Sequence, residues 1–202
     1  CDENDDIQIG DPIFKSYGKN KKFHGMIRTV IAIEDNSYVK KLVEEKVDGD
    51  VMVVEGKAST KCALLGDNLA MKAFENGWSG FIINGCIRDS EIINNIPIGI
   101  KAINTMPIKS QKNNIGEYKK ALNFANINFQ EGEYVYSDPD GIIVLKDQLV
   151  PEEKLVNNGL IPYAVITFTK TYQNGWSFNW NRQYIFIEKW EIYFRKHIVP
   201  DK

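Results

Sequence analysis

Three ionisable residues in the middle of the sequence could together bind and activate a small organic acid. Asp67 is followed, after the twenty residues 68–87, by the adjacent pair Arg88 and Asp89. The planar guanidinium group of an arginine matches a carboxylate or a 2-keto acid. Two aspartates supply hard oxygen donors, few enough to leave most of an octahedral Mg²⁺ shell to water and substrate. A divalent ion and an arginine that face a 2-keto acid are what the stabilisation of an enolate requires.

Each of these residues also has a purely structural interpretation. Asp67 could only cap the helix that the following residues predict. Asp89 or Ser90 could cap the next helix, and Arg88 with Asp89 could form a structural ion pair. Residue types and spacing alone therefore leave both interpretations open.

The elements that must position these residues alternate between strands and helices. Apolar and β-branched runs predict strands at residues 25–33, 50–55, 80–84 and 98–105. Between them, apolar residues at helical spacing predict helices at 36–45, 68–76 and 90–95. Asn36 or Ser37 is the expected N-cap of the first helix and Asp67 that of the second, while small residues predict a loop at 56–60. This alternation indicates an α/β fold with parallel pairing in the middle.

From residue 121 onward the pattern is that of short strands alone. These are predicted at residues 122–124, 127–129, 133–136 and 141–145. Asp138 and Asp140 lie in a Pro- and Gly-containing turn between the last two, and we interpret them as turn residues.

The predicted topology brings the candidate residues to one edge of the sheet. In open α/β sheets, ligands bind in a crevice outside the carboxyl ends of the strands. Arg88 and Asp89 follow one such strand end, and the helix that starts near Asn68 presents free N–H groups to a carboxylate. We therefore expect Asp67, Arg88 and Asp89 to meet there.

Composition narrows the function classes. The chain has 202 residues with 25 Lys and Arg against 27 Asp and Glu, a formal net charge of −2. This length suits one sizeable core, or a domain of about 150 residues with an appendage. The near-neutral balance argues against nucleic-acid binding as the main role, because that needs a concentrated basic surface. No apolar run approaches the ~18–20 residues of a spanning helix, so we expect no membrane segment.

The cysteines and histidines argue against disulfide and zinc chemistry. Cys1, Cys62 and Cys86 form no CxxC pair and leave an odd thiol, so a reducing, cytoplasmic compartment is expected. Cys62 and Cys86 are interpreted as packing residues rather than nucleophiles. Of the two histidines, His24 is expected at a strand start rather than in a metal site.

The candidate residues lie in a stretch that resembles a known family, the one named for the regulator of ribonuclease activity A. It includes class II 4-hydroxy-4-methyl-2-oxoglutarate and 4-carboxy-4-hydroxy-2-oxoadipate aldolases. The resembling stretch is ALLGDNLAMKAFENGWSGFIINGCIRD, residues 63–89, in which the family's Asp, twenty residues, Arg-Asp signature is intact. The similarity covers about residues 1–149 and includes 1–2, 23–25, 29–30, 34–36 and 134–141.

The resemblance implies a fold, an assembly and a site. The fold is a swivelling β/β/α domain, usually assembled as a trimer with active sites at subunit interfaces. Asp89 resembles the direct ligand of Mg²⁺ or Mn²⁺. Arg88 resembles the residue that binds the keto acid and steadies the pyruvate enolate, and Asp67 the one that orients metal-bound water. Backbone N–H groups around Leu65, Gly66 and Asp67 would face the substrate carboxylate.

The resemblance also implies an activity. Residues 1–150 are expected to cleave a 4-hydroxy-2-oxo di- or tricarboxylic acid to pyruvate and a second keto acid, with oxaloacetate decarboxylation as a side activity. The alternative is a non-catalytic trimer that binds and inhibits an endoribonuclease. The founding regulator lacks the aspartate of the Arg-Asp pair, so Asp89 favours the lyase. A third hypothesis is a degenerate or truncated member of the family whose tail has replaced part of the interface.

The two ends of the chain depart from the family pattern. Family members carry a short segment before the position of Cys1, so Cys1 is expected to be internal rather than lipidated. Residues 151–202 do not align, and no residue is assigned there to the acid that the aldolases take from a neighbouring subunit. This aromatic-rich extension could be a swapped arm, an interface patch or sequence never selected to fold; residues 184–194 could form a strand or an amphipathic helix.

Overall fold

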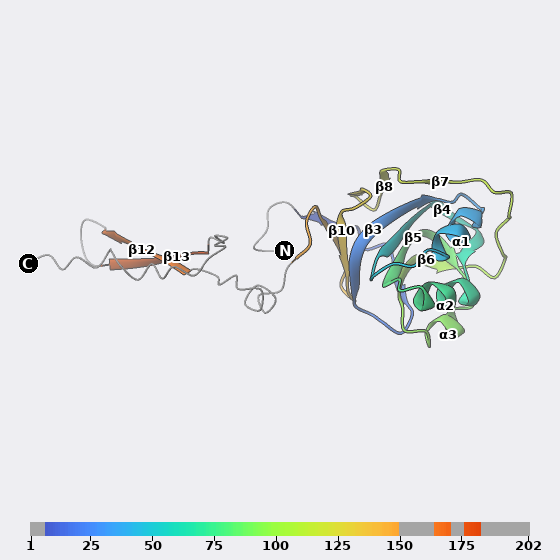
Figure 1. The fold of residues 1–202 in the computed structure, drawn as a ribbon, viewed down its shortest axis with the longest axis horizontal. Coiled ribbons are helices and arrows are strands. Elements are labelled where there is room, and N and C mark those ends of the chain that lie inside the picture. Colours follow the sequence, from blue (N-terminus) through green and yellow to red (C-terminus); the bar gives the residue numbers. More distant parts are fainter. Residues whose placement is uncertain (1–6, 150–163, 171–175, 183–202) are drawn as a thin grey trace, which may run out of the picture. The chain divides into compact units, whose positions relative to one another are not determined.

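The structure is a computed structural model that describes residues 7–149, 164–170 and 176–182. The chain divides into two units, Cys1–Gln148 and Leu149–Lys202. All residues singled out for chemistry lie in the first unit, which Figure 1 shows as a sheet with helices packed on one side.

Four parallel strands form the centre of the first unit. They are β3 (Phe23–Ile31), β4 (Val51–Leu65), β5 (Gly80–Ile87) and β6 (Gly99–Thr105), adjacent in that order. Every residue of β5 is buried, as its unbroken apolar sequence predicts for a strand covered on both faces. The sheet thus confirms the predicted parallel pairing.

Antiparallel strands extend the sheet on both sides. β10 (Tyr134–Ser137) pairs with β3, followed outward by β11 (Ile142–Leu145) and β1 (Gln8–Ile9). β2 (Lys15–Tyr17) pairs with β6 at the other edge, and β7 (Glu117–Tyr118) adds a short pairing to β3. The hairpin of β8 (Leu122–Phe124) and β9 (Ile127–Phe129) forms a separate small sheet. We call β1, β11, β10 and the start of β3 the wing.

Three helices cover one face of the parallel strands: α1 (Ser37–Val43), α2 (Asp67–Glu75) and α3 (Ser90–Ile93). Their apolar sides join one core cluster with the strands, for example Val39, Ala73 and Phe81. The opposite face of the strands contributes to a second cluster with the wing and the β8–β9 hairpin, including Ile82, Phe129 and Val135. Helices, central sheet and β layer are the α/β architecture expected from the sequence.

Two local predictions were wrong. Residues 56–60 are not a loop, because β4 runs from Val51 to Leu65, but its pairing with β5 shifts register between Glu55 and Leu65. Lys57 and Ala58 have positive φ angles there, so the small residues mark an irregular stretch of strand. Asp67 is not an N-cap, because α2 begins at Asp67 and Gly66 occupies the cap position.

The two internal cysteines are buried and free. Burial raises the pKa of both thiols, with Glu34 adding to the effect at Cys62. Both thiols therefore stay protonated near neutral pH, which supports their interpretation as packing residues.

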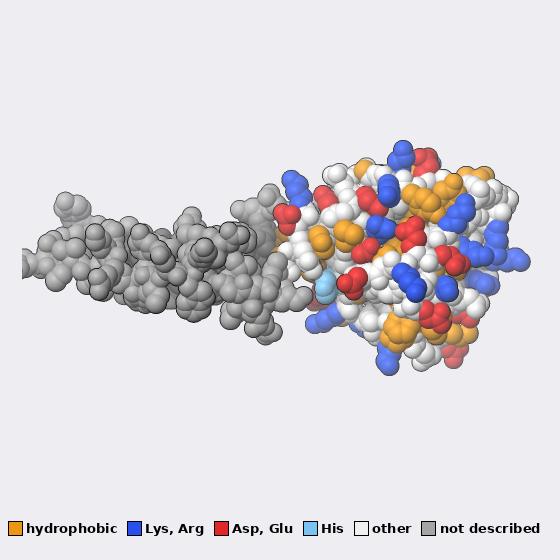
Figure 2. Space-filling model, in the orientation of Figure 1, with side chains coloured by type: hydrophobic (Ala, Val, Ile, Leu, Met, Phe, Trp, Pro, Cys, Tyr) orange, Lys and Arg blue, Asp and Glu red, His pale blue; other side chains and the backbone are white. Residues whose placement is uncertain are grey.

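Charged side chains of both signs are interspersed over the face of the first unit seen in Figure 2. No helix among the described residues is long and apolar enough to cross a membrane.

The second unit is described only as a hairpin. β12 (Ala164–Lys170) pairs antiparallel with β13 (Trp176–Arg182), and Phe168 lies opposite Phe178. Residues 184–194, for which a strand or a helix was expected, lie outside the described residues.

Candidate active site

The ends of β4 and β5 bring the candidate residues together. Leu65 lies opposite Ile87 in the parallel ladder, and the Arg88 backbone N–H donates to the Leu65 carbonyl at 2.9 Å. The residues that follow each strand, Gly66 and Asp67 on one side and Arg88 on the other, therefore emerge side by side. Adjacent strand ends thus bring together Asp67 and Arg88, which are separated by twenty intervening residues in sequence.

Position 66 favours a glycine because neighbouring side chains approach it closely, and not because of its backbone angles. Its φ of −129° and ψ of 179° are extended and open to any residue. A Cβ at this position would lie 2.9 Å from Asp89 Oδ2 and 3.0 Å from Arg88 Nε. A side chain here would have to displace both groups, so Gly66 lets the Arg88–Asp89 pair approach the start of α2.

Arg88 and Asp89 form an ion pair, with 3.3 Å between Nε and Oδ2. Their side chains are 38% and 32% exposed, and such a pair contributes only about 0–1 kcal/mol to stability. Asp89 also has a left-handed backbone, with φ 56° and ψ 36°, a conformation that costs of order 1 kcal/mol in a residue other than glycine. Seven other described residues that are not glycine also have positive φ angles, so this backbone conformation alone does not set Asp89 apart.

Asp67 points its carboxylate along the first turn of α2. Oδ1 accepts the Asn68 backbone N–H at 2.7 Å and the Asn68 side-chain amide at 3.1 Å. Among the described residues no hydrogen bond to Oδ2 is found, so this oxygen can accept one from water or a ligand.

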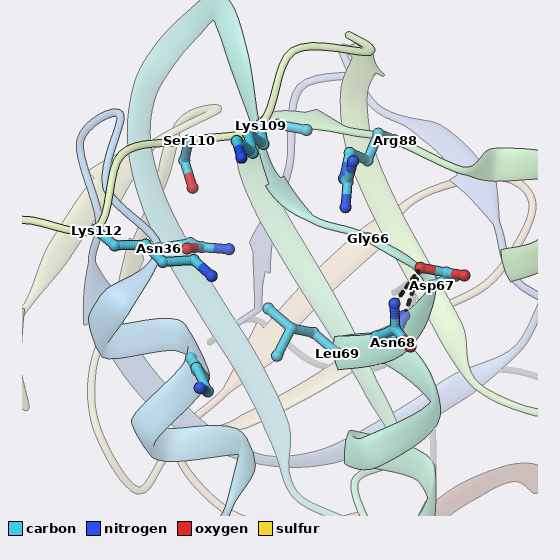
Figure 3. A pocket seen from close by; sticks show the side chains of 11 residues that line it. Asn36, Gly66, Asp67, Asn68, Leu69, Arg88, Lys109, Ser110 and Lys112 are labelled. Carbon is cyan, nitrogen blue, oxygen red and sulfur yellow. Dashed lines mark hydrogen bonds between the residues drawn. The ribbon is translucent and has the colours of Figure 1, made fainter.

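A cavity of about 250 Å³ opens at this edge, and Gly66, Asp67 and Arg88 line it. In Figure 3, Arg88 and Lys112 reach toward the cavity from opposite sides, with Leu69 at its floor. Asp89 does not line the cavity itself, but its side chain forms an ion pair with Arg88, which does. The side chain of Leu65 is 1% exposed and belongs to the core. Only the backbone of Leu65 could therefore serve a ligand.

Sequence reasoning missed the other side of this cavity, which is made mainly by polar and basic residues: Asn36, Lys40, Lys109, Ser110 and Lys112. Of the charged residues that line it, four are basic and only Asp67 is acidic. The available signal was the Lys-Ser-Gln-Lys run at residues 109–112, but nothing in sequence shows that it folds over the end of β4. The cavity is strongly cationic although the chain is almost neutral, and we call it the cationic cavity.

Backbone pairing fixes the segment that carries two of these lysines. The Ala63 N–H donates to the Ile108 carbonyl at 2.8 Å, and the Gln111 N–H to the Glu34 carbonyl at 3.0 Å. Asp35, only 3% exposed, accepts the N–H groups of Ser37 and Asn113 at 2.8 Å and 2.5 Å. This carboxylate therefore joins the start of α1 to the lysine-bearing segment.

Asp35 is ionised in spite of its burial. Burial alone would raise the pKa of its carboxyl, but hydrogen bonds from Ser37, Asn113 and Ile115 outweigh burial and lower the pKa. Asn36 occupies the N-cap position of α1, as expected, but makes no side-chain cap hydrogen bond, and the Ser37 N–H is instead accepted by Asp35. The side chain of Asn36 instead donates to the Leu64 carbonyl at 3.1 Å.

The carboxylates of the site fit a hard divalent ion that keeps most of its water. Among the described residues no group of three or more His, Cys, Asp or Glu side chains gathers as a metal cluster. Mg²⁺ does not need one, because it binds through one or two carboxylates and completes an octahedron with water and substrate. A Cβ at Gly66 would lie 2.9 Å from Asp89 Oδ2, so the Asp89 carboxylate lies beside the residue that precedes Asp67.

A second cavity, of about 590 Å³, lies on the wing. His24 and Tyr136 stack in it with ring centroids 5.4 Å apart, and Ile9, Ile142 and Ile143 add apolar wall. As expected, His24 lies at a strand start, on β3, and Asp138 serves the turn, where its Oδ1 accepts the N–H groups of Asp140 and Gly141. We call it the wing cavity.

Comparison with known proteins finds relatives that match nearly the whole of the first unit. The profile of the RraA-like family, described as Aldolase/RraA, matches residues 1–144. A protein of Alkalilimnicola ehrlichii is 44% identical over 151 residues, which are 74% of this chain and 94% of that protein. One of Marinomonas sp. is 47% identical over 143 residues, 71% of this chain and 89% of that protein. Both carry the provisional name 4-hydroxy-4-methyl-2-oxoglutarate aldolase.

Solved structures agree with this placement. One from Geobacillus kaustophilus, titled S-adenosylmethionine: 2-dimethylmenaquinone methyltransferase, has a TM-score of 0.71 at 45% identity and covers 72% of this chain and 90% of that chain. The RNA-processing inhibitor RraA from Thermus thermophilis has a TM-score of 0.72 at 36% identity and covers 74% and 91%. The names describe a lyase, a transferase and an inhibitor, so the chemistry must be argued from the site.

Proposed function

Because the chain belongs to the RraA-like family, described as Aldolase/RraA, we propose that it is a divalent-metal-dependent pyruvate lyase that works in the cationic cavity. The substrate would be a 4-hydroxy-2-oxo di- or tricarboxylic acid, cleaved to pyruvate and a second keto acid. The observation that carries the proposal is that Arg88, paired with Asp89, lines the same small cavity as Asp67.

The reaction breaks the bond between C3 and C4 of the substrate. The C4 hydroxyl loses its proton and becomes the carbonyl of the second keto acid. The electron pair of the broken bond passes to the pyruvate half as an enolate, which takes up a proton at C3. Catalysis therefore requires groups that stabilise negative charge on the enolate oxygen and a carrier for the proton.

Arg88 supplies the fixed positive charge. Its guanidinium group can hold the 2-keto acid and stabilise the enolate oxygen, a role in which a planar, permanently charged fork is favoured over lysine. Gly66 admits this side chain to the start of α2, where N–H groups can meet the substrate carboxylate. The ion pair with Asp89 orients the guanidinium group.

Asp67 would orient the water that carries the proton. One carboxylate oxygen is occupied by Asn68, and this fixes the direction of the other. Asp89, with Asp67 nearby, would hold Mg²⁺ or Mn²⁺. When bound, such an ion polarises the keto acid and draws charge from the enolate oxygen. Loss of carbon dioxide from oxaloacetate gives the same enolate, so oxaloacetate decarboxylation is the expected side activity.

The test is pyruvate release from 4-hydroxy-4-methyl-2-oxoglutarate and from oxaloacetate, with Mg²⁺ and with EDTA. We expect release that EDTA abolishes, and a loss of at least ~10³-fold in Asp89→Ala, since removal of a metal ligand also removes its charge stabilisation. Glu91→Ala, an exposed carboxylate two residues away, is the matched control and should keep full activity. Equal turnover by wild type and Asp89→Ala would refute the site assignment.

The second candidate function is that of a non-catalytic regulator that binds an endoribonuclease. The observation that favours it is the structural likeness to the RNA-processing inhibitor from Thermus thermophilis. A pull-down with an endoribonuclease tests it, and recovery of nothing would count against it. For both functions we propose a homotrimer. Light scattering on the full chain and on residues 1–150 would test the assembly and the contribution of the extension.

A further inference from the structure

We propose that the wing cavity is a second ligand site, which binds an uncharged, planar aromatic molecule. This inference goes beyond the proposed function, because the two cavities lie at different edges of the central sheet. β3 begins at Phe23, in the wall of the wing cavity, whereas Gly66 and Arg88 of the cationic cavity follow the ends of β4 and β5. Parallel strands begin at one edge of a sheet and end at the other, so the two cavities can be occupied independently.

Four side chains that line the wing cavity form one row across the four strands of the wing. In register from β1 to β3, the row consists of Ile9, Ile143, Tyr136 and His24. Side chains alternate between the faces of a strand, and the neighbouring Val135 is buried in the core, so the row lies on the outer face of the wing. Figure 1 shows the helices on the other side of the central strands from β10. Three strand spacings give the row a length of about 14 Å, enough for a molecule of two or three fused rings.

The two rings of this row already form a stack that a ligand can extend. The ring planes of His24 and Tyr136 differ by 8°, with their centroids 5.4 Å apart. Rings at this separation are offset, and a further flat ring in the same orientation gains the same kind of contact. The side chain of His24 is exposed, so this end of the row is open to a ligand. An aliphatic ligand would contact the isoleucines but could not extend the stack.

The charges around the wing cavity balance, which indicates an uncharged ligand. Lys22, Asp138 and Asp140 line the cavity, and the buried Lys101 donates to the Asp138 carbonyl. Two positive and two negative groups favour neither sign of charge on a ligand. A charged ligand would also lose hydration against the isoleucines without gaining an opposite charge of its own. The wing cavity therefore selects for shape and apolar surface, in contrast to the cationic cavity.

The size of the wing cavity fits a small molecule. Its volume of about 590 Å³ lies within the range of roughly 300–1,000 Å³ that is typical of concave sites for small organic ligands. Such sites are mainly apolar and aromatic, as the row of isoleucines and stacked rings is.

Four probes of similar size test the proposal. At pH 7, 6-methylquinoline is planar and uncharged, 1-methylquinolinium is planar and positive, quinoline-6-carboxylate is planar and negative, and camphor is uncharged but not planar. Binding to the full chain is measured by ligand-observed NMR titration without added metal. We expect 6-methylquinoline to bind at least ~5-fold more tightly than each of the other three, the effect of one good ring contact. No binding of 6-methylquinoline, or equally tight binding of any other probe, would overturn the proposal.

Loss of either stacked ring should remove the preference for 6-methylquinoline over camphor. Tyr136→Leu and His24→Leu each keep an apolar side chain and remove one ring. We expect each to weaken 6-methylquinoline binding by at least ~5-fold and to leave camphor binding unchanged. His24 is exposed, so His24→Leu remains informative if Tyr136→Leu fails to fold.

Tyr134→Leu is the matched control for these variants. Tyr134 lies on the same strand, β10, but does not line the wing cavity, so its replacement should leave the affinity for 6-methylquinoline unchanged. An equal loss of affinity in Tyr134→Leu would overturn the proposal. A preference for 6-methylquinoline over camphor that survives both His24→Leu and Tyr136→Leu would do the same.

Asp89→Ala separates binding at the wing from the proposed lyase. We expect it to bind 6-methylquinoline as tightly as wild type does, both with Mg²⁺ and with EDTA. An affinity that depends on Mg²⁺, or that falls in Asp89→Ala, would assign the probe to the cationic cavity and overturn the proposal. Pyruvate release is measured on the same samples, so that its absence refutes the lyase while probe binding decides the wing site.

Discussion

The cationic cavity and the wing cavity lie on the same domain but differ in almost every physical respect. The wing cavity is the larger, about 590 Å³ against about 250 Å³. Its wall is formed by isoleucines and a stacked His24–Tyr136 pair, and its charged side chains, Lys22, Asp138 and Asp140, are of both signs. The cationic cavity has one acidic and four basic side chains, next to a residue with a strained backbone. Convergent charge, rather than volume, therefore marks the candidate active site.

The two cavities also differ in how the fold uses its polar groups. At the wing, the Asp138 carboxylate is occupied by its own turn, and the buried Lys101 donates to the Asp138 carbonyl at 2.6 Å. At the cationic cavity, one oxygen of Asp67 and the ammonium groups of Lys40, Lys109 and Lys112 have no hydrogen-bond or ion-pair partner among residues 7–149. The wing uses its charges to hold the structure, whereas the cationic cavity leaves its charges available to a ligand.

The largest expected contrast is between a glycine of each cavity. A methyl group at Gly66 would lie 2.9 Å from Asp89 Oδ2 and 3.0 Å from Arg88 Nε, whereas one at Gly141 would meet nothing within 4 Å. Gly66→Ala should therefore displace the ion pair and lower kcat for pyruvate release by about 10²-fold, the effect of a misplacement of ~1 Å. Gly141→Ala should leave it unchanged. Both are measured as steady-state rates with Mg²⁺.

That contrast would fail in either of two ways. Full activity in Gly66→Ala would mean that the close approach at the start of α2 is not used in catalysis. An equal loss in Gly141→Ala would mean that the wing cavity contributes to the reaction. Circular dichroism and melting curves of both variants establish that a lost rate is not lost folding.

Asp35 holds the backbone beside the cationic cavity and Asp138 holds the turn at the wing cavity. The two aspartates should differ in their contribution to the free energy of unfolding. Asp35 is buried and ionised and joins two segments, so Asp35→Ala should lower the free energy of unfolding by about 2 kcal/mol. The Asp138 carboxylate accepts hydrogen bonds only within its own half-exposed turn, and Asp138→Ala should cost about 1 kcal/mol or less. Urea denaturation at pH 7 measures both.

The effect of Asp35 should also depend on pH. Its folded pKa lies below the ordinary 3.8, so its stabilisation is complete above that value. It is lost as the pH falls through the lower folded value. Wild type and Asp35→Ala should therefore converge in stability under strongly acidic conditions. A gap that stays constant over that range would show that Asp35 does not remain ionised in the fold.

The sequence predicted the strand and the helix beside the cationic cavity better than the side chains that line it. The strand at 80–84 and the helix at 68–76 could be predicted, because apolar periodicity reports on local structure, but the strand extends three residues further, to Ile87. The meeting of Asp67 with Arg88 followed from the rule on strand ends in parallel sheets. Lys109 and Lys112 could not be placed, because their position depends on the long-range pairing of their segment with Ala63 and Asp35.

The two errors differ in kind. Small residues at 56–60 suggested a loop, but β4 continues through them with shifted register because β5 pairs on both sides of the irregularity. There a tertiary contact overrides a local preference. Asp67 was expected to cap α2, yet the helix starts one residue earlier, with Gly66 at the cap position, and the Asp67 carboxylate still accepts the Asn68 N–H.

The smallest predicted effect concerns the charge on Lys101, which is 3% exposed beside the wing turn. Burial lowers the pKa of its ammonium group, and Asp138 and Asp140 offset part of that shift. The folded protein therefore holds this proton less tightly than the unfolded chain does, and keeping it charged costs stability at pH 7. Lys101→Met removes that cost but also removes the hydrogen bond to Asp138, so we expect the free energy of unfolding to increase by about 0.5 kcal/mol.

This gain in stability should depend on pH. As the pH rises toward the ordinary pKa of 10.5, the unfolded chain also releases its proton and the gain should vanish. Denaturation of Lys101→Met and of the exposed control Lys22→Met at pH 7 and pH ~10 measures this. A gain that is equal at both pH values would show that the buried charge is not what limits stability at the wing. The wing charges would then not differ from those of the cationic cavity in serving the structure.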